Sequence, residues 1–175
     1  MGYSQQVQDA IRTIADFPTT GIQFRDITPV MEKPAAFAAA IAGLQQMLEG
    51  VEWAKVAAIE SRGFLFAAPL ALHAEKPLVL LRKAGKLPGE TRAVSYDLEY
   101  GRATLEVHTD SFAQGDRVLI LDDLLATGGT AAAAAALVTE SGAEVAGFCF
   151  LVELDDLGGR ASLDGTAPVF SLVHY

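Results

Sequence analysis

The run Val118–Thr130, VLILDDLLATGGT, constrains the fold of this chain more than any other segment. Its first part belongs to the apolar stretch Arg117–Leu121, which is typical of a strand buried on both faces of a parallel sheet. Two acids, Asp122 and Asp123, follow at the expected carboxyl end of that strand, and the small-residue loop Ala126–Thr130 leads into a helix. Parallel α/β sheets bind ligands beyond the carboxyl ends of their strands, so this run predicts a binding site.

The rest of the chain alternates in the same way, which predicts an α/β fold with a central, mostly parallel sheet flanked by helices. Further strands are expected at Lys55–Ile59, Pro77–Leu81, Val145–Val152 and Val169–Val173, and a hairpin at Ala93–Tyr96 with Ala103–His108. Helices are expected at Gln5–Phe17, from Pro34 to about Glu49, at Gly63–His73 and at Gly129–Ser141. Between the first two helices, Phe17–Val30 is expected to be an ordered loop, because Pro18, Gly21 and Pro29 interrupt the helical pattern.

Composition narrows the class of protein. A chain of 175 residues with 51% hydrophobic and 20% charged residues is expected to form one globular domain. The net charge of −9 argues against general nucleic-acid binding. No apolar run approaches the length of a membrane span, and the N-terminal residues lack a signal-peptide layout, so we expect a cytoplasmic protein without a membrane partner. The single cysteine, Cys149, is expected to be buried.

The loop Ala126–Thr130 has the composition of a phosphate site. Small residues let backbone N–H groups approach phosphate oxygens, Thr127 and Thr130 add hydroxyl donors, and the helix N-terminus adds partial positive charge. The spacing matches neither a Walker loop nor a dinucleotide fingerprint. For the two acids, three interpretations remain open: metal ligands, acceptors for a sugar's vicinal hydroxyls, or a cap for the following helix.

A second cluster is basic, although the chain as a whole is acidic. Arg82, Lys83, Lys86 and Arg92 lie close together in the sequence, beside glycines. They could belong to a solvated loop or to a site for a phosphorylated small molecule. The acids Glu153, Asp155 and Asp156 are expected to be solvated rather than to bind a metal, and the three histidines have no zinc-ligand spacing.

The run Val118–Thr130 resembles the phosphoribosyl pyrophosphate (PRPP) motif of type I phosphoribosyltransferases, and its part DDLLATGGT is similar to the version found in adenine phosphoribosyltransferases. The resemblance implies that Asp122 and Asp123 hold the ribose hydroxyls of PRPP. It also implies that the 5′-phosphate lies in a cradle formed by Ala126, Thr127, Gly128, Gly129 and Thr130.

Three further stretches resemble the same family. Glu60–Phe64, ESRGF, is similar to its pyrophosphate loop, which often contains a non-proline cis peptide; with the basic cluster, this implies that Ser61, Arg62, Gly63, Arg82, Lys83 and Lys86 bind pyrophosphate. Phe17–Val30 resembles the N-terminal hood that selects adenine, which assigns Gln23, Phe24 and Arg25 to the base. Leu124, which lies in the PRPP motif, is assigned to the base as well. Gln23 departs from the family, whose members commonly have an apolar residue at that position. Ser95–Gly101, SYDLEYG, resembles a flexible loop that closes over the site and carries Glu99 and Tyr100.

The resemblance implies a purine salvage enzyme that joins adenine to PRPP and releases AMP and pyrophosphate. Mg²⁺, bound mainly through PRPP, is the expected cofactor, and Glu99 is the candidate for the proton or charge role at the base. The family also suggests a homodimer. We expect a single domain over 1–175, with a hood at about 1–34, a core at about 35–175 and the closing loop at about 84–102. The alternatives are transfer to another purine and a non-catalytic PRPP or nucleotide-binding regulator of the same fold.

Overall fold

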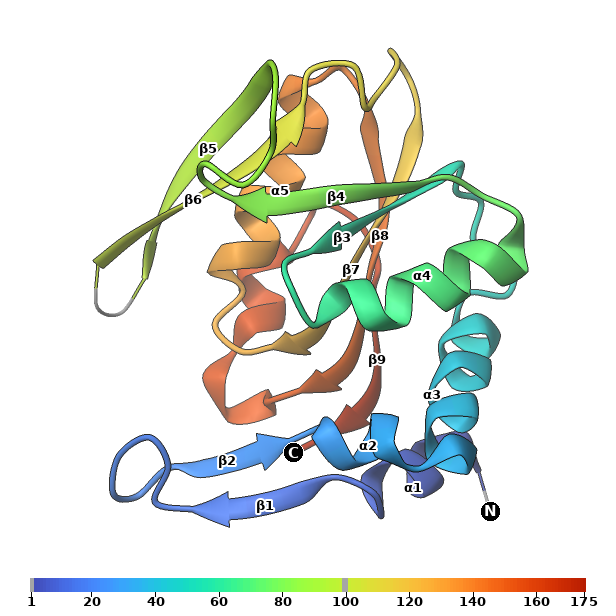
Figure 1. Ribbon diagram of the computed structural model, residues 1–175, viewed down its shortest axis with the longest axis vertical. Helices are drawn as coiled ribbons and strands as arrows, with labels where there is room; N and C mark the ends of the chain where they lie inside the picture. The colour runs from blue at the N-terminus through green and yellow to red at the C-terminus, as the bar shows by residue number, and fades with distance from the viewer. Residues whose placement is uncertain (1, 99–100) are drawn as a thin grey trace.

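A seven-stranded sheet forms the centre of the computed structural model, which describes residues 2–98 and 101–175 (Figure 1). The strand order is β5-β6-β4-β3-β7-β8-β9. The five strands from β4 to β9 in this order are parallel, and the β5–β6 hairpin joins antiparallel beside β4. The predicted mostly parallel sheet is therefore confirmed. The strands are β3 (Lys55–Ile59), β4 (Leu78–Lys83), β5 (Thr91–Leu98), β6 (Gly101–His108), β7 (Arg117–Leu125), β8 (Glu144–Glu153) and β9 (Val169–His174).

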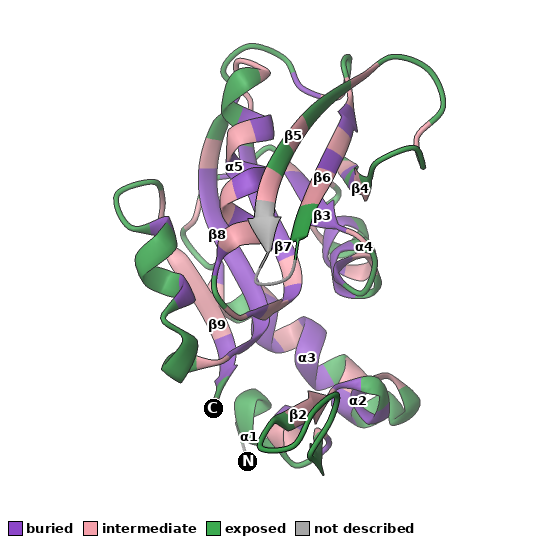
Figure 2. Cartoon of the chain, turned by 90° about the vertical axis from the view of Figure 1, so that its left-hand side faces the viewer, coloured by how far each residue is buried: buried purple, intermediate pink, exposed green. Residues whose placement is uncertain are grey.

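Helices cover both faces of this sheet, and the central strands supply apolar side chains to each. In β3, Val56 and Ala58 pack with α3 (Pro34–Met47) and α4 (Gly63–Ala74), while Ala57 and Ile59 pack with α5 (Gly129–Glu140). Alternate residues of a strand point to opposite faces, so a strand covered on both sides has to be apolar throughout. Figure 2 shows the resulting buried layer along β3, β7 and β8.

The N-terminal segment differs from the predicted long helix. Helix α1 (Tyr3–Gln8) is short, and Arg12–Ala15 forms strand β1, which pairs antiparallel with β2 (Gln23–Asp26) in a separate two-stranded sheet. The spacing of apolar residues is compatible with a continuous helix, but the pairing of β1 with β2 stabilises the extended backbone instead. Part of the expected loop is therefore β2, and α2 (Thr28–Glu32) follows it.

The acid pair also differs in its local structure. Strand β7 continues through Asp122 and Asp123 to Leu125, so the acids lie inside the strand rather than after its end. The ten-residue strand β8 explains the extension, because it offers pairing partners along the whole of β7, including Phe150 opposite Asp122.

Two other features agree with expectation. The predicted hairpin is present and is longer on both sides than the sequence indicated, as β5 and β6. Cys149 is buried, and burial raises the pKa of its thiol to about 12. Among the described residues, none of the helices has the length and apolarity that crossing a membrane requires.

Candidate functional site

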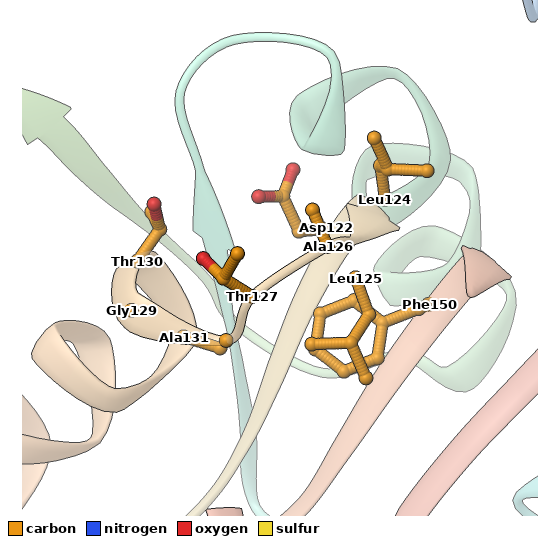
Figure 3. A pocket seen from close by; sticks show the side chains of 10 residues that line it. Asp122, Leu124, Leu125, Ala126, Thr127, Gly129, Thr130, Ala131 and Phe150 are labelled. Carbon is orange, nitrogen blue, oxygen red and sulfur yellow. The ribbon is translucent and has the colours of Figure 1, made fainter. Parts of the chain in front are cut away.

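Two adjoining cavities lie at the carboxyl end of the parallel strands. The smaller has a volume of about 80 Å³ and is formed around the loop after β7 (Figure 3). The larger has a volume of about 480 Å³ and extends toward the ends of β3 and β4. Both are lined by Asp122, Leu124, Ala126 and Thr130, so they form one continuous site. This position agrees with the predicted location of the ligand.

The loop around the smaller cavity leads directly into α5. Thr127, Gly128 and Gly129 are also part of its lining, and α5 begins at Gly129. The first N–H groups of a helix have no partner within the helix, and its N-terminus carries partial positive charge. In Figure 3 the polar groups of Asp122, Thr127 and Thr130 lie on the same side of the loop. The arrangement can therefore bind a phosphate group.

A second segment, distant in sequence, packs against the backbone of this loop. Gly128 adopts a left-handed φ of 85°, and an added Cβ there would lie 2.5 Å from the carbonyl oxygen of Gly159. Conversely, a Cβ on Gly159 would lie 2.1 Å from the carbonyl oxygen of Ala126. Gly159 begins the short 3₁₀ helix η2 (Gly159–Leu163), from which Ser162 Oγ donates to the carbonyl oxygen of Thr127 at 2.8 Å. The two glycines permit a backbone contact that no larger residue allows.

The carboxylates of Asp123 and Asp122 differ in how far hydrogen bonds and nearby charges compensate for their burial. Asp123 is buried and accepts a hydrogen bond from Arg62 Nε at 2.7 Å. Asp122 accepts one from the backbone N–H of Asp123 at 2.8 Å. Burial and the neighbouring carboxylate of Asp123 nevertheless raise the pKa of Asp122 well above its ordinary value. Gly63 packs directly against Asp122, because an added Cβ there would lie 3.0 Å from Asp122 Oδ1. The pair thus favours a ligand that brings hydrogen-bond donors or positive charge.

Glu60 organises the basic cluster. Its carboxylate accepts hydrogen bonds from Lys86 Nζ at 2.5 Å, from the backbone N–H of Lys83 at 2.9 Å and from Arg82 Nε at 3.3 Å. Burial alone would raise the pKa of Glu60, but these donors outweigh burial and lower it to about 2. Glu60 is therefore an anion that draws positive charge to the rim of the larger cavity.

The predicted pyrophosphate residues divide into three groups. Ser61, Arg62 and Lys83 line the larger cavity, and Arg82 and Lys86 pair with Glu60, which also lines it. Gly63 is outside the lining and packs against Asp122. The Glu60–Ser61 peptide is cis, as the resemblance implies.

The sequence analysis assigned no function to two residues of the site. The first, Glu60, belongs to the pyrophosphate loop, and its position directly after a buried strand is the same signal that pointed to Asp122. Tyr96 on β5 lines the larger cavity, and its phenolic oxygen accepts a hydrogen bond from Thr130 Oγ1 at 3.3 Å. Local sequence offers no signal for Tyr96, since only the sheet brings β5 over the start of α5.

The predicted base-binding residues Gln23, Phe24 and Arg25 form part of β2 and are outside the lining of the two cavities. Phe24 packs edge-to-face against Phe17, with ring centroids 5.1 Å apart. Arg25 donates to Thr13 Oγ1 at 2.5 Å. Leu124 lines both cavities. Glu99 and Tyr100 lie outside the described residues.

The expected solvated acids include one exception. Glu153 is buried, where Arg160 contacts both of its carboxylate oxygens, at 2.6 and 3.0 Å, and Ser171 Oγ donates at 2.5 Å. With Asp155 and His174 it forms a group close enough to share a metal ion. The guanidinium of Arg160 already neutralises Glu153, so this group is better explained as a structural ion pair. The expectation of solvation was wrong for Glu153 because β8 and β9 enclose it.

Comparison with known proteins agrees with this geometry. The phosphoribosyl transferase domain profile matches residues 29–167. The adenine phosphoribosyltransferase of Kosmotoga olearia is 50% identical over 169 residues, which cover 97% of this chain and 99% of that protein.

Two solved structures have the same fold. The adenine phosphoribosyltransferase of Thermoanaerobacter pseudethanolicus matches with a TM-score of 0.94 and 48% identity, over 98% of this chain and 99% of that chain. The enzyme of Saccharomyces cerevisiae, complexed with D-2,5-dideoxy-2,5-imino-altritol 1,6-bisphosphate and adenine, matches with a TM-score of 0.92 and 40% identity, over 97% and 98% of the two chains.

The fold and the strand–acid–loop–helix site define a phosphoribosyltransferase. The chain belongs to that family, and within it to the group of adenine phosphoribosyltransferases.

We predict that Gly159→Ala disrupts the loop around the smaller cavity. The added Cβ has to displace the backbone of Ala126, and forced overpacking of this kind costs about 1–3 kcal/mol. The expected result is a lower thermal midpoint together with weakened binding of PRPP, measured by calorimetry. Gly2→Ala is the control, because Gly2 has a negative φ of −69° and open space around its Cα. Equal PRPP affinity in wild type and Gly159→Ala would contradict the backbone contact.

We also predict that Asp122 lowers the stability of the ligand-free protein at neutral pH. Since its native pKa lies above that of the unfolded chain, the native state holds an extra proton between the two values, and stability falls as pH rises through that window. Asp122→Asn removes this fall. Thermal unfolding from about pH 4 to about pH 8 should therefore show a smaller decrease for Asp122→Asn than for wild type. The exposed Asp110→Asn is the control, and identical pH profiles for all three proteins would refute the prediction.

Proposed function

We propose that this protein transfers the 5-phosphoribosyl group of PRPP to adenine, giving AMP and pyrophosphate, in purine salvage. The observation that carries the proposal is the acid pair and phosphate-type loop at the end of β7, in a chain that shares half of its residues with named adenine phosphoribosyltransferases. The net charge of −9 argues against the alternative of a nucleic-acid-binding regulator.

PRPP would lie across both cavities. Its 5′-phosphate would occupy the smaller one, where it would accept hydrogen bonds from the loop backbone and from the hydroxyls of Thr127 and Thr130. The ribose hydroxyls would donate to Asp122 and Asp123. These hydroxyls supply the donors that the uncompensated Asp122 carboxylate lacks. Its high pKa thus supports the proposal that a sugar binds here.

The pyrophosphate group would extend into the larger cavity toward Arg62 and Lys83. Arg82 and Lys86 are held nearby by Glu60 and would contribute charge as negative charge develops on the leaving group. Preorganised charges of this kind stabilise a transition state without reorganising during the reaction.

The donor set also fits Mg²⁺, which we propose as the cofactor. Carboxylate oxygens are hard ligands, and burial beside the Asp123 carboxylate raises the pKa of Asp122, so a bound cation would stabilise its ionised form. Asp122 is the residue best placed to hold the ion, together with oxygens of PRPP, since Asp123 is paired with Arg62. Bound there, Mg²⁺ would neutralise the charge of the leaving pyrophosphate.

In the reaction, N9 of adenine forms a bond to C1′ of the ribose while the bond from C1′ to the pyrophosphate oxygen breaks. The electron pair of that bond leaves with pyrophosphate, and the base loses one imidazole proton. We assign Glu99 to accept that proton or to stabilise the charge, as a general base. The segment 84–102, with Tyr100 beside Glu99, would close over the site and exclude water that could hydrolyse PRPP.

The base would be held by the hood, residues 1–34, with Phe24 stacking on the purine and Leu124 lining the site below. Backbone groups near Gln23 would read the hydrogen-bonding edge of adenine, and Arg25 would lie close by. Gln23 is exposed, which supports recognition through the backbone rather than through its side chain. Another purine is the alternative substrate if the Gln23 side chain turns inward.

We further propose a cytoplasmic homodimer built from single-domain subunits. Leu65 and Leu72, seven residues apart on α4, are exposed, and so is Leu80 on the adjoining strand β4. Large apolar side chains on a surface favour burial against a partner.

We predict that the protein forms AMP from adenine only when PRPP and Mg²⁺ are both present, and that it prefers adenine to hypoxanthine and guanine. The reason is the base-selecting hood combined with the sugar-phosphate site. Nucleotide formation is measured with each base in turn by chromatography. Turnover of all three bases at the same rate would refute the assignment of adenine as the substrate. The absence of turnover with every base would refute the proposed enzymatic activity.

We predict that Glu99→Gln lowers kcat by about a hundredfold or more, since general acid–base help typically contributes at least that much. The amide preserves size but cannot carry charge or accept the proton. Affinity for PRPP should stay nearly unchanged. Single-turnover kinetics are needed, because slow product release can mask a chemical defect. Glu90→Gln, directly before β5, is the control, and wild-type single turnovers in Glu99→Gln would remove Glu99 from the chemistry.

A further inference from the structure

The geometry points to the C-terminal residue, Tyr175, as a positioning residue for the purine base: its ring holds Arg25 of the hood in place. This inference rests on the proposed function, because it concerns how the hood meets adenine. It joins the last residue of the chain to a strand near its beginning (Figure 1).

The orientation of Arg25 is set by two contacts. The guanidinium carbon lies 3.9 Å from the centroid of the Tyr175 ring, within the range of a cation–π interaction. Arg25 also donates to Thr13 Oγ1, and Thr13 is its cross-strand partner on β1. A guanidinium carries five N–H donors in a rigid plane, so fixing this plane also fixes where its other donors point.

The Tyr175 ring can hold Arg25 because the end of this chain is anchored. Chain termini are poorly ordered unless they are tied down. Here the N–H of Tyr175 donates to the carbonyl oxygen of Glu153 at 3.0 Å, and its carbonyl oxygen accepts from the N–H of Asp155 at 2.9 Å. The ring is half-buried against the core that α3 and α4 form with the sheet. Glu153 is the last residue of β8 and Asp155 lies two residues beyond it, so both backbone contacts are at the end of the sheet where the site lies.

The consequence is a fixed distance between two parts of the site. β1 and β2 form their own small sheet, separate from the sheet that carries Asp122 and Asp123. Arg25 follows Phe24 on β2, so a contact that holds Arg25 also limits the movement of the residue proposed to stack on the base. Through Tyr175, the base-binding strand is tied to the same sheet end that binds the sugar. Adenine should therefore meet C1′ in a set orientation.

The decisive experiment replaces the Tyr175 ring and measures the KM for adenine and the KM for PRPP separately. Tyr175→Leu keeps apolar volume but removes the aromatic face, whereas Tyr175→Phe keeps that face and loses only the hydroxyl. We expect Tyr175→Leu to raise the KM for adenine by roughly three- to tenfold, the range of a cation–π contact, with the KM for PRPP unchanged. Tyr175→Phe should behave as wild type.

A second arm tests whether Tyr175 acts through Arg25. In an Arg25→Ala background, Tyr175→Leu should add no further loss of adenine affinity, because the partner of the ring is already absent. Additive losses would overturn the inference, as would a KM for adenine that Tyr175→Leu leaves unchanged. If both KM values rise together with a lower thermal midpoint, Tyr175 only supports the fold and the inference is also overturned.

The proposed function is tested independently in the same assay. Wild-type protein that forms no AMP refutes the proposed function, whereas wild-type protein that forms AMP while Tyr175→Leu keeps a normal adenine KM refutes only the role of Tyr175.

Discussion

The rest of the site depends on how the charge of two neighbouring carboxylates, near the end of the central strand β7, is compensated. Strand residues around them are apolar and buried, so their charge has to be compensated locally. Asp123 obtains this compensation from Arg62, which explains why the loop after β3 turns toward β7. Asp122 accepts a hydrogen bond from a backbone N–H, but burial and the neighbouring carboxylate of Asp123 raise its pKa. The protein thus keeps an unfavourable charge at the position where we propose that a sugar and a metal ion bind.

The opposite arrangement occurs directly after the neighbouring strand β3. Glu60 collects two cationic side chains and a backbone donor, and its pKa falls to about 2 although its carboxylate is buried. At the acid pair the site holds two carboxylates beside Arg62, whereas around Glu60 it holds Arg82 and Lys86 at close range. A ligand with hydroxyl donors at one end and a pyrophosphate at the other complements both conditions. This pattern of charge supports the proposed PRPP site more specifically than the composition of the loop Ala126–Thr130 does.

Support from segments distant in sequence recurs throughout the structure. Gly159 touches the backbone of the phosphate-type loop, Tyr96 reaches Thr130 from the β5–β6 hairpin, and Tyr175 stacks against Arg25 of the hood. Each contact joins a ligand-facing segment to an element that the seven-stranded sheet has already placed. The site therefore depends on the sheet for its dimensions, even where loops provide the chemistry.

The sequence by itself determined the mostly parallel sheet, the strand that carries the acids and the helix at Gly129, because continuous apolar strands and a small-residue turn are local patterns. It also predicted Asp122, Asp123 and the loop from Ala126 to Thr130 as site residues, since all belong to one strand and the loop after it. Only the tertiary structure decided that Arg12–Ala15 is a strand, because its partner is β2 and its own spacing equally suits a helix. It likewise buried Glu153 and gave roles to Glu60, Gly159 and Tyr175. Those roles arise from contacts between residues far apart in the chain, which local periodicity does not encode.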